Sequence, residues 1–378
     1  MKTFATHPRS LMLALLVSLL AGCGGASPSA TVTGWVIGQS VDPSSLPPTP
    51  TTKILKTDDG GASWILQTLP AQAVGFNGLD ISAVNSRVAW AAVGDQYGRD
   101  GGILHTVDGG ASWTWQVLPD GLGANHKNIK SIKGVSPAEA WAASLVGDVL
   151  HTTDGGNSWA IVPVKDRNGS IIAMKQVNRI EVTGQDIWIA DNLGGSRGAI
   201  HSADAGRTWR QELLPHMGIS PGLMAISAFS PSVAWAAVAG GGYLWGTSDG
   251  GTSWSKSKDT IVAGSDFDDV CASAANVVWV AFNNGNGGGV AARITVSNGS
   301  FETNSYTNAH YNLEGISAMS DNQTAWLVGM KTFNAAAALP LGAIYVTHDG
   351  GVTWQPQNLP DNARDVILWK VSFVGARR

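Results

Sequence analysis

Short apolar stretches that contain a tryptophan recur along the chain at intervals of 44 to 55 residues. All but the first follow a stretch of alternating apolar positions, such as Leu79–Val84, and precede a short apolar stretch, such as Gly102–Thr106. Such alternation is typical of half-buried strands, and helical periodicity is absent after the N-terminal apolar segment. The pattern therefore predicts seven repeated units of short strands, with tryptophans at Trp35, Trp90, Trp141, Trp188, Trp235, Trp279 and Trp326.

A turn motif, of which T-x-D-G-G-x-S-W is the commonest form, follows the third stretch in six of the units. Its aspartate can accept hydrogen bonds from the backbone N–H groups that follow, and its glycine permits a positive φ. Its tryptophan begins a fourth strand and can bury a large ring against the neighbouring sheet. Six equivalent copies indicate a structural role rather than catalysis, for Asp59, Asp108, Asp154, Asp204, Asp249 and Asp349.

The spacing of these motifs predicts the fold class. Consecutive box aspartates lie 45 to 50 residues apart, except for a last gap of 100 that spans two units. In the unit around Trp279, Ile294–Gly299 stands in the place of the box. Four-stranded units of this length are typical of propeller blades, so we expect an all-β, seven-bladed β-propeller with Asp-box turns. The first unit lacks an inner strand, and Leu368–Val374 has the pattern of one. We expect this C-terminal strand to complete the first blade.

The N-terminus has the features of a bacterial lipoprotein signal. Residues 1–23 combine basic Lys2 and Arg9 with the apolar run Leu11–Leu20, which is too short to span a bilayer, and end in Leu-Ala-Gly-Cys. We expect Cys23 to be lipidated, residues 24–31 to form a short tether, and residues 32–378 to form the propeller. The alternative is an ordinary secretory signal with a chance cysteine. The expected location is the bacterial cell envelope, and Gly24 favours the outer membrane if the host is Gram-negative.

Composition narrows the classes of partner. Only 14% of residues are charged and the net charge is −4, so a basic stripe for nucleic acid is not expected. The second of the two cysteines, Cys271, lies in an apolar strand pattern and is expected to be a small buried residue without a disulfide partner. No cofactor is expected, and a metal is only an alternative role for the histidines described next.

Candidate ligand-binding residues lie in the loops at the end of the ring opposite the boxes. Tyr97 and Arg99 share a loop that could grip a sugar or a peptide, although it could also be solvated. His126 and His310 stand in similar His-x-Asn segments, which indicates a turn role or, with nearby carboxylates, a metal site. Mixed charges begin the inner strands, at Asp80, Lys130, Arg179, Asp268, Asp269, Glu314 and Lys370. They predict a polar funnel at the channel mouth, where paired carboxylates could alternatively hydrolyse a glycoside.

The repeated box, with upstream strands such as Gly-Trp-Val-Ile-Gly at Trp35 and Ala-Trp-Ala-Ala-Val at Trp90, resembles the photosystem II assembly and stability factor family. That resemblance covers about residues 32–378 and implies a non-enzymatic scaffold that holds membrane-protein precursors. Instead of that family's basic patch, this chain has scattered arginines, at Arg99, Arg167, Arg179 and Arg197.

Sialidases also carry Asp boxes, but their catalytic tyrosine–glutamate pair and arginine triad are not evident here. We therefore expect a membrane-tethered, extracytoplasmic binding or assembly scaffold that is not an enzyme. Its partner would be a protein, with carbohydrate as a second class of ligand. The alternative is a sialidase-like glycoside hydrolase.

Overall fold

The computed structural model describes residues 31–42, 49–95, 97–123, 126–191, 198–214, 222–238, 243–257, 266–284, 288–297, 300–308, 311–331 and 342–377. The chain divides into two units, Met1–Ala30 and Thr31–Arg378, and the described residues belong to the second. The predicted signal segment, Cys23 and His310 therefore lie outside the described residues. No helix in the described ranges is long and apolar enough to cross a membrane.

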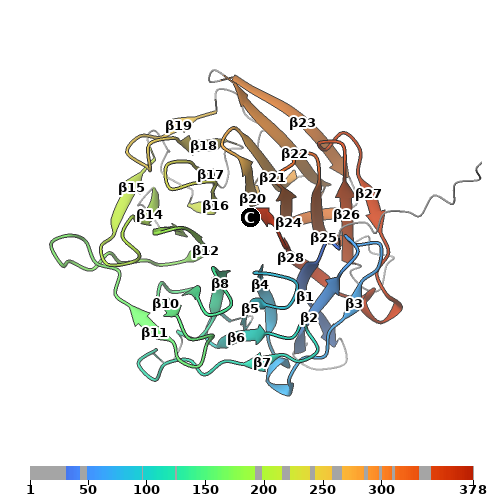
Figure 1. Ribbon diagram of the computed structural model, residues 1–378, viewed down its shortest axis with the longest axis horizontal. Coiled ribbons are helices and arrows are strands. Elements are labelled where there is room, and N and C mark those ends of the chain that lie inside the picture. The colour runs from blue at the N-terminus through green and yellow to red at the C-terminus, as the bar shows by residue number, and fades with distance from the viewer. Residues whose placement is uncertain are drawn as a thin grey trace, which may run out of the picture. The chain divides into compact units, whose positions relative to one another are not determined.

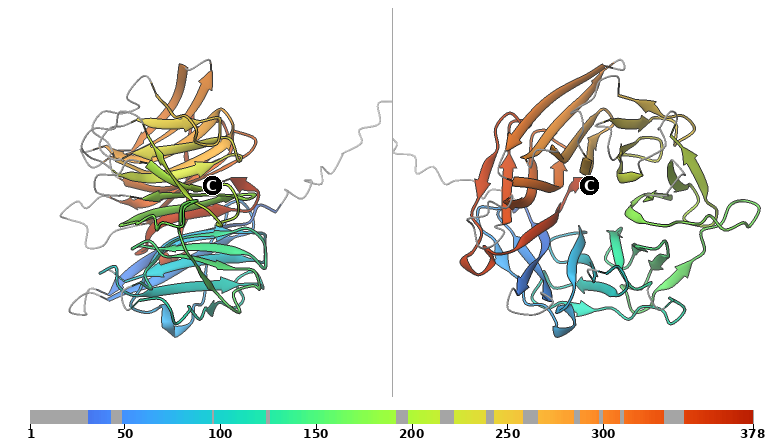
Figure 2. Two further views of the ribbon diagram at one scale, coloured as in Figure 1. Left: turned by 90° about the vertical axis from the view of Figure 1, so that its left-hand side faces the viewer. Right: turned by 180° about the vertical axis from the view of Figure 1, so that it is seen from behind.

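The unit Thr31–Arg378 is a ring of seven antiparallel sheets around a central channel (Figure 1), and Figure 2 shows it from the side and from behind. The seven-bladed β-propeller predicted from the sequence is confirmed. The helical residues of the described chain form two short 3-10 turns, Ala71–Ala73 and Asp361–Ala363.

Each blade is given from the channel outward. Blade one consists of β28 (Ile367–Phe373), β1 (Gly34–Asp42), β2 (Thr49–Thr57) and β3 (Ile65–Leu66), and blade two consists of β4 (Asn77–Ala83), β5 (Ala89–Gly94), β6 (Gly101–Thr106) and β7 (Thr114–Trp115). Blade three consists of β8 (Ile129–Gly134), β9 (Ala140–Ser144), β10 (Val149–Thr152) and β11 (Ala160–Val162), and blade four consists of β12 (Val177–Thr183), β13 (Asp186–Asp191), β14 (Gly198–Ser202) and β15 (Arg210–Leu213). Blade five consists of β16 (Leu223–Ala228), β17 (Ala234–Val238), β18 (Leu244–Thr247) and β19 (Ser255–Lys256), and blade six consists of β20 (Asp266–Ala274), β21 (Val277–Asn284), β22 (Gly288–Ser297) and β23 (Ser300–Asn308). Blade seven consists of β24 (Tyr311–Met319), β25 (Ala325–Lys331), β26 (Gly342–Thr347) and β27 (Gln355–Gln357), and β29 (Ala376–Arg377) adds a fifth strand to it.

The C-terminal strand closes the ring, as predicted. β28 pairs antiparallel with β1 from Gly34↔Phe373 to Gln39↔Ile367, so the end of the chain supplies the inner strand of the first blade. After a turn, β29 pairs with the end of β24 in blade seven, at Ala318↔Arg377 and Met319↔Ala376. The last strands thus join the first blade to the last one.

The Asp boxes form one kind of turn, on the end of the ring that we call the box face. In blade three, Asp154 Oδ1 accepts from the Ser158 amide at 3.0 Å, and Oδ2 accepts from the Ser158 hydroxyl at 2.6 Å. Thr152 Oγ1 donates to Asp154 and accepts from the Gly156 amide. Hydrogen bonds from Ser158, and then from Thr152, lower the pKa of Asp154 to about 2. The carboxylate therefore holds the turn closed, in agreement with a structural role.

Blade six lacks the box. Its outer strands β22 and β23 instead run as a hairpin from Gly289↔Asn308 to Ser297↔Ser300, and they are ten and nine residues long. In blade five, Trp235 packs in a cluster with Val290 and Ile294 of this hairpin. These aliphatic side chains of blade six therefore pack on Trp235 in the place that the tryptophan of a box would take. Cys271 of the same blade is buried, as expected, and burial raises the pKa of its thiol to about 12.

Candidate functional site: the mouth of the central channel

Every inner strand has a bulge near its start, at the end of the channel opposite the boxes. The pairing of each inner strand with its neighbour skips one residue there, for example between Gly78 and Asp80 in β4 and between Phe267 and Asp269 in β20. A bulge breaks the alternation of side chains, so two successive residues can face the same side. The seven skipped residues are Trp369, Leu79, Lys130, Asn178, Met224, Asp268 and Glu314, in the order of blades one to seven, and we call them the upper ring.

All seven upper-ring residues line one cavity of about 300 Å³ at this mouth, together with Asp80, Arg179, Ala225, Asp269 and Lys370 from the residues that follow them. We call the latter positions the second ring. The structure therefore brings together Arg179, Asp268, Asp269 and Glu314 from the residues predicted to bind a ligand. Small-molecule pockets in proteins begin at about this size.

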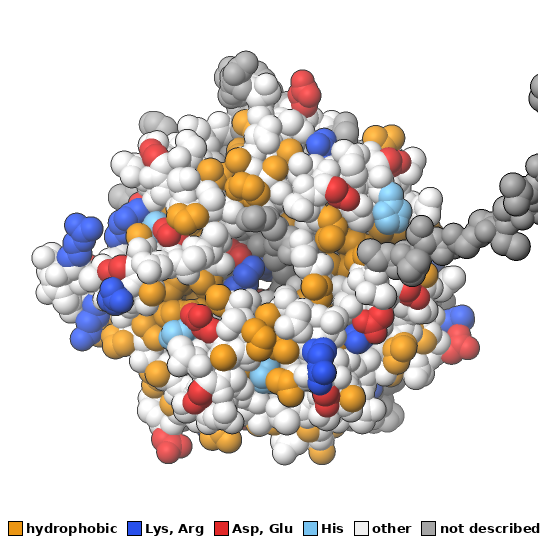
Figure 3. Space-filling model, viewed as in Figure 1, with side chains coloured by type: hydrophobic (Ala, Val, Ile, Leu, Met, Phe, Trp, Pro, Cys, Tyr) orange, Lys and Arg blue, Asp and Glu red, His pale blue; other side chains and the backbone are white. Residues whose placement is uncertain are grey.

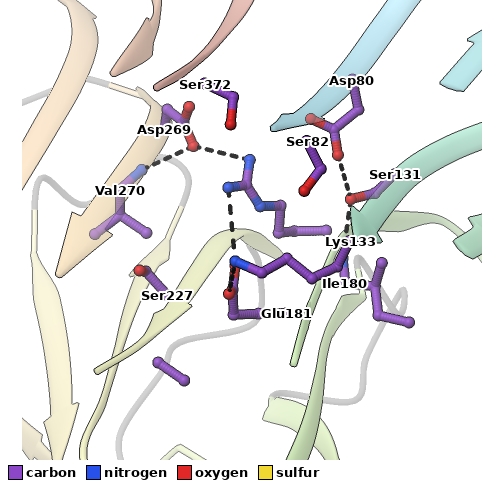
Figure 4. A network of polar contacts seen from close by, with 12 residues as sticks. Asp80, Ser82, Ser131, Lys133, Ile180, Glu181, Ser227, Asp269, Val270 and Ser372 are labelled. Atoms are coloured by element: carbon purple, nitrogen blue, oxygen red, sulfur yellow. Dashed lines mark hydrogen bonds and ion pairs between the residues drawn. The ribbon is translucent and has the colours of Figure 1, made fainter. Parts of the chain in front are cut away.

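Asp269 is held by four donors. Its carboxylate is paired with Arg179 Nη1 of blade four at 3.3 Å and with Lys370 Nζ of blade one at 3.2 Å, and it accepts from the amides of Val270 and Ile316. Figure 4 shows this network reaching across the channel from Asp269 to Glu181 and Lys133. A carboxylate with its oxygens engaged in this way stabilises the ring and is poorly suited to act as a catalytic base.

Asp80 has a similar role in blade two. It accepts from the Ser131 hydroxyl at 2.7 Å, from the Ile132 amide at 2.9 Å and from the Ile81 amide at 2.9 Å. Ser131 in turn accepts from the Ile180 amide of blade four. Asp80 and Ser131 thus tie the inner strands of blades two, three and four together, and this use of the funnel residue Asp80 was not visible in the sequence.

Arg179 is the buried cation at the centre of this network. Burial alone would lower the pKa of Arg179, but Asp269, Asp80 and Glu181 outweigh it and raise the pKa. Because its carboxylate partners come from the chain itself, the guanidinium is committed to the fold. Arg179 is therefore a poor candidate for gripping a partner, although the sequence placed it among the ligand-binding residues.

The charged residues of the upper ring are Lys130, Asp268 and Glu314. Asn283 Nδ2 donates to Asp268 Oδ2 at 2.7 Å, and the Glu314 carboxylate also hydrogen-bonds to Asn283. Lys370 Nζ donates to the backbone oxygens of Asp268 and Glu314, at 3.0 and 2.9 Å. Burial raises the pKa of Glu314, while Lys370, Asn283 and Lys130 oppose this rise. Burial and then Lys370 lower the pKa of Lys130.

Tyr97, Arg99 and His126 lie outside the cavity, in loops at the same end of the ring. Arg99 stacks over the ring of Tyr97 at 4.3 Å, and Asp95 pairs with Arg99 at 3.5 Å. His126 Nδ1 lies 2.7 Å from an oxygen of Asp148 in blade three. Tyr97 is 58% exposed, so this group forms an accessible surface. Within the described ranges, no cluster of three His, Cys, Asp or Glu side chains could hold a metal ion.

A basic edge on blade four was missed by the sequence analysis. The exposed side chains of Lys165, Arg167, Arg207 and Arg210 come from two segments that the hydrogen bond from the Trp209 amide to the Lys165 carbonyl joins at 2.8 Å. Lys and Arg side chains gather at the left of the box-face view in Figure 3. The two segments are forty residues apart in the chain, so spacing alone could not reveal the group. Arg197, one of the scattered arginines, lies outside the described residues.

Comparisons with known proteins agree with this architecture. The family described as "Photosynthesis system II assembly factor YCF48" matches residues 34–182, and the "BNR/Asp-box repeat" matches residues 345–356. Among curated proteins, no match was found.

Three solved structures have the same fold. The structure titled "YCF48 bound to D1 peptide" is 18% identical, with a TM-score of 0.54 and coverage of 82% of this chain and 93% of that one. YCF48 from Cyanidioschyzon merolae is 16% identical, with a TM-score of 0.54 and coverage of 80% and 93%. A protein from Lactobacillus plantarum is 11% identical, with a TM-score of 0.56 and coverage of 91% and 99%. At these identities the likeness shows the fold, an Asp-box propeller similar to that of the assembly factors.

Proposed function

Because the chain is an Asp-box β-propeller that resembles the photosystem II assembly factors, we propose that it is a binding scaffold that holds a protein partner without catalysing a reaction. The observation that carries this proposal is the state of the mouth carboxylates: Asp80 and Asp269 are engaged in bonds between blades. Their bonds serve the fold, which leaves the mouth and the loops around Tyr97 as a binding surface. One structure of the same fold is titled as bound to a D1 peptide, which supports a protein as the class of partner.

We propose further that the scaffold is tethered outside the cytoplasm. The lipobox at Leu20–Cys23 supports lipidation of Cys23, and the envelope, with the outer membrane favoured in a Gram-negative host, is the corresponding location. A short tether would hold the ring close to the bilayer, where membrane or envelope proteins are its accessible partners.

Site-specific photo-crosslinking in the native host tests the scaffold. A crosslinking amino acid replaces Tyr97, which is 58% exposed on the mouth side, or Val352, which is 67% exposed in the box of blade seven. We expect one defined protein to be crosslinked from position 97 and not from position 352. Equal labelling from both positions, or no protein crosslinked from position 97, would overturn the proposal.

A glycoside hydrolase is the second candidate, and one observation favours it. Burial raises the pKa of Glu314, which shares Asn283 with Asp268, and a raised carboxyl pKa is what a general acid requires. A screen with aryl glycosides distinguishes the two functions. Turnover that is abolished in Glu314→Gln would establish the hydrolase, whereas a scaffold shows no turnover in either protein.

A further inference from the structure

The upper ring separates charge around the mouth of the channel. Asp268 and Glu314 stand on neighbouring blades six and seven, Trp369 and Leu79 follow on blades one and two, and Lys130 stands on blade three. The cavity therefore has an acidic side and a basic residue, with an apolar surface between them.

Arg179 and Lys370 of the second ring pair directly with Asp269, whereas Glu314 of the upper ring makes no ion pair within the described residues. Lys130 makes no hydrogen bond or ion pair within the described residues, although Asp80 and Glu314 attract it at longer range. Glu314 and Asp268 share the neutral amide of Asn283. Lys370, the nearest cation, is directed at Asp269 and at backbone oxygens.

Burial makes both signs of charge unfavourable at this mouth. It raises the pKa of Glu314 and lowers the pKa of Lys130, because neither charge keeps the solvation that it would have in water. A ligand that is only a cation would satisfy the acidic side and repel Lys130, and an anion would do the reverse. A ligand that carries both charges can satisfy both sides at once.

We propose that the channel mouth binds a small zwitterion of dipeptide size, with its ammonium group at Asp268 and Glu314, its carboxylate at Lys130, and an apolar side chain against Leu79 and Trp369. This inference rests on the proposed binding function and names a class of ligand for its central cavity. The volume of about 300 Å³ accommodates such a molecule. The indole of Trp369 is oriented by its hydrogen bond to Gln39 Oε1 at 2.9 Å, and an aromatic ring beside an ammonium site adds a further attraction.

Calorimetric titration with three matched probes tests the proposal on the purified full chain: alanyl-leucine, its C-terminal amide and its N-acetyl derivative. The first carries both charges, the second only the ammonium group and the third only the carboxylate. We expect alanyl-leucine to bind, and we expect each blocked probe to bind at least about tenfold more weakly because it lacks one of the two charges. A tenfold change in affinity corresponds to about 1.4 kcal/mol. Equal affinity for all three probes, or no binding of alanyl-leucine at millimolar concentration, would overturn the proposal.

Two variants assign the ends of the ligand. Lys130→Met should abolish the preference for alanyl-leucine over its amide, and Glu314→Gln should reduce the preference for alanyl-leucine over the N-acetyl probe. Lys127→Met, three residues from Lys130 and exposed, is the matched control and should bind like the unmodified protein. A melting temperature measured on each variant separates loss of the site from loss of the fold.

The outcome is separable from that of the scaffold. If no dipeptide binds while the position-97 crosslink to one protein persists, the zwitterion site is wrong and the scaffold stands. If alanyl-leucine binds with the expected preferences while no protein is crosslinked, the scaffold is wrong and the mouth is a small-molecule site.

Discussion

The indole of Trp159, in the box of blade three, packs edge-on against the indole of Trp90 in blade two, with ring centroids 5.7 Å apart and ring planes at 88°. The same arrangement recurs between Trp113 and Trp35, where the centroids are 5.5 Å apart at 90°. It also recurs between Trp254 and Trp188, at 5.8 Å and 88°, and between Trp354 and Trp279, at 6.2 Å and 89°. Four of the six boxes therefore join their blade to the preceding one through a pair of buried aromatic rings.

Removal of one such ring should destabilise the whole propeller. Trp159 is buried, and Trp159→Ala leaves a cavity at the interface of two blades, for which we expect a loss of about 3–5 kcal/mol in the free energy of unfolding by urea. Ile161→Ala, two residues further and more exposed, is the control and should cost less than about 1 kcal/mol. Similar losses in the two variants would mean that the indole pair does not join the blades.

Deletion of residues 364–378 should destabilise the entire ring rather than one end of it. The ring of Phe373 stacks on Trp326 of blade seven at 3.5 Å and meets Trp64 of blade one edge-on at 6.0 Å, so this segment contacts both sides of the closure. We expect aggregation or protease sensitivity throughout the chain. Removal of residues 376–378 alone takes away only β29 and is the control, with a smaller loss. A soluble deletion variant with an unchanged melting transition would contradict the role of β28.

The box of blade four has an alanine in a left-handed conformation, and a glycine there should stabilise the protein. Ala205 has a φ of 57°, whereas Gly155, at the same position of the third box, has a φ of 75°. A side chain in this region costs about 1–2 kcal/mol, and the extra freedom of glycine in the unfolded chain offsets part of the gain. We expect Ala205→Gly to raise the free energy of unfolding by up to about 1 kcal/mol and Gly155→Ala to lower it by about as much. An opposite order of melting temperatures would refute this.

Stability should fall in mildly acidic solution because of His105. Its imidazole is buried and stacks on Trp90 at 3.4 Å, and burial lowers its pKa from 6.5 to about 4, against a hydrogen bond to the Gly155 backbone. The unfolded chain takes up the proton first, so the stabilising contribution is complete above pH 6.5 and is lost as the pH falls towards 4. Its size is about 3 kcal/mol.

His105→Phe keeps an aromatic ring against Trp90 and should remove this pH dependence in unfolding experiments between pH 7 and 4. The box aspartates, such as Asp154 with a pKa of about 2, titrate at lower pH and do not overlap with this window. An identical pH profile in the two proteins would assign the effect to another group.

The tether can be tested in cells. Cys23→Ser removes the lipid acceptor of the lipobox, so we expect the mature protein to leave the membrane fraction and retain its melting temperature. Ser44→Ala, outside the lipobox, serves as the control and should stay in the membrane fraction. Fractionation that finds Cys23→Ser still bound to membranes would exclude the lipoprotein hypothesis.

The candidate site was predicted in position but not in role. Asp80, Lys130, Asp269 and Glu314 begin inner strands, so the sequence placed them at one mouth of the channel, and the cavity lies there. It did not distinguish Asp269, which two cations and two amides hold, from Lys130, which has no partner within the described residues. That difference depends on contacts across the ring between residues about ninety positions apart in the chain, such as Arg179 and Asp269.

The sequence by itself determined the number of blades, the position of the box turns and the closure by the C-terminal strand. These features arise from a repeated period and from hydrogen bonds within a few residues, such as those from Ser158 to Asp154, so local pattern is sufficient to predict them. Only the tertiary structure decided which side chains face the channel. A bulge in each inner strand turns two successive residues to the same side, and a period of two cannot encode this because the skipped residue is defined by pairing with the neighbouring strand. The separation of charge around the mouth follows from seven such bulges in one closed ring.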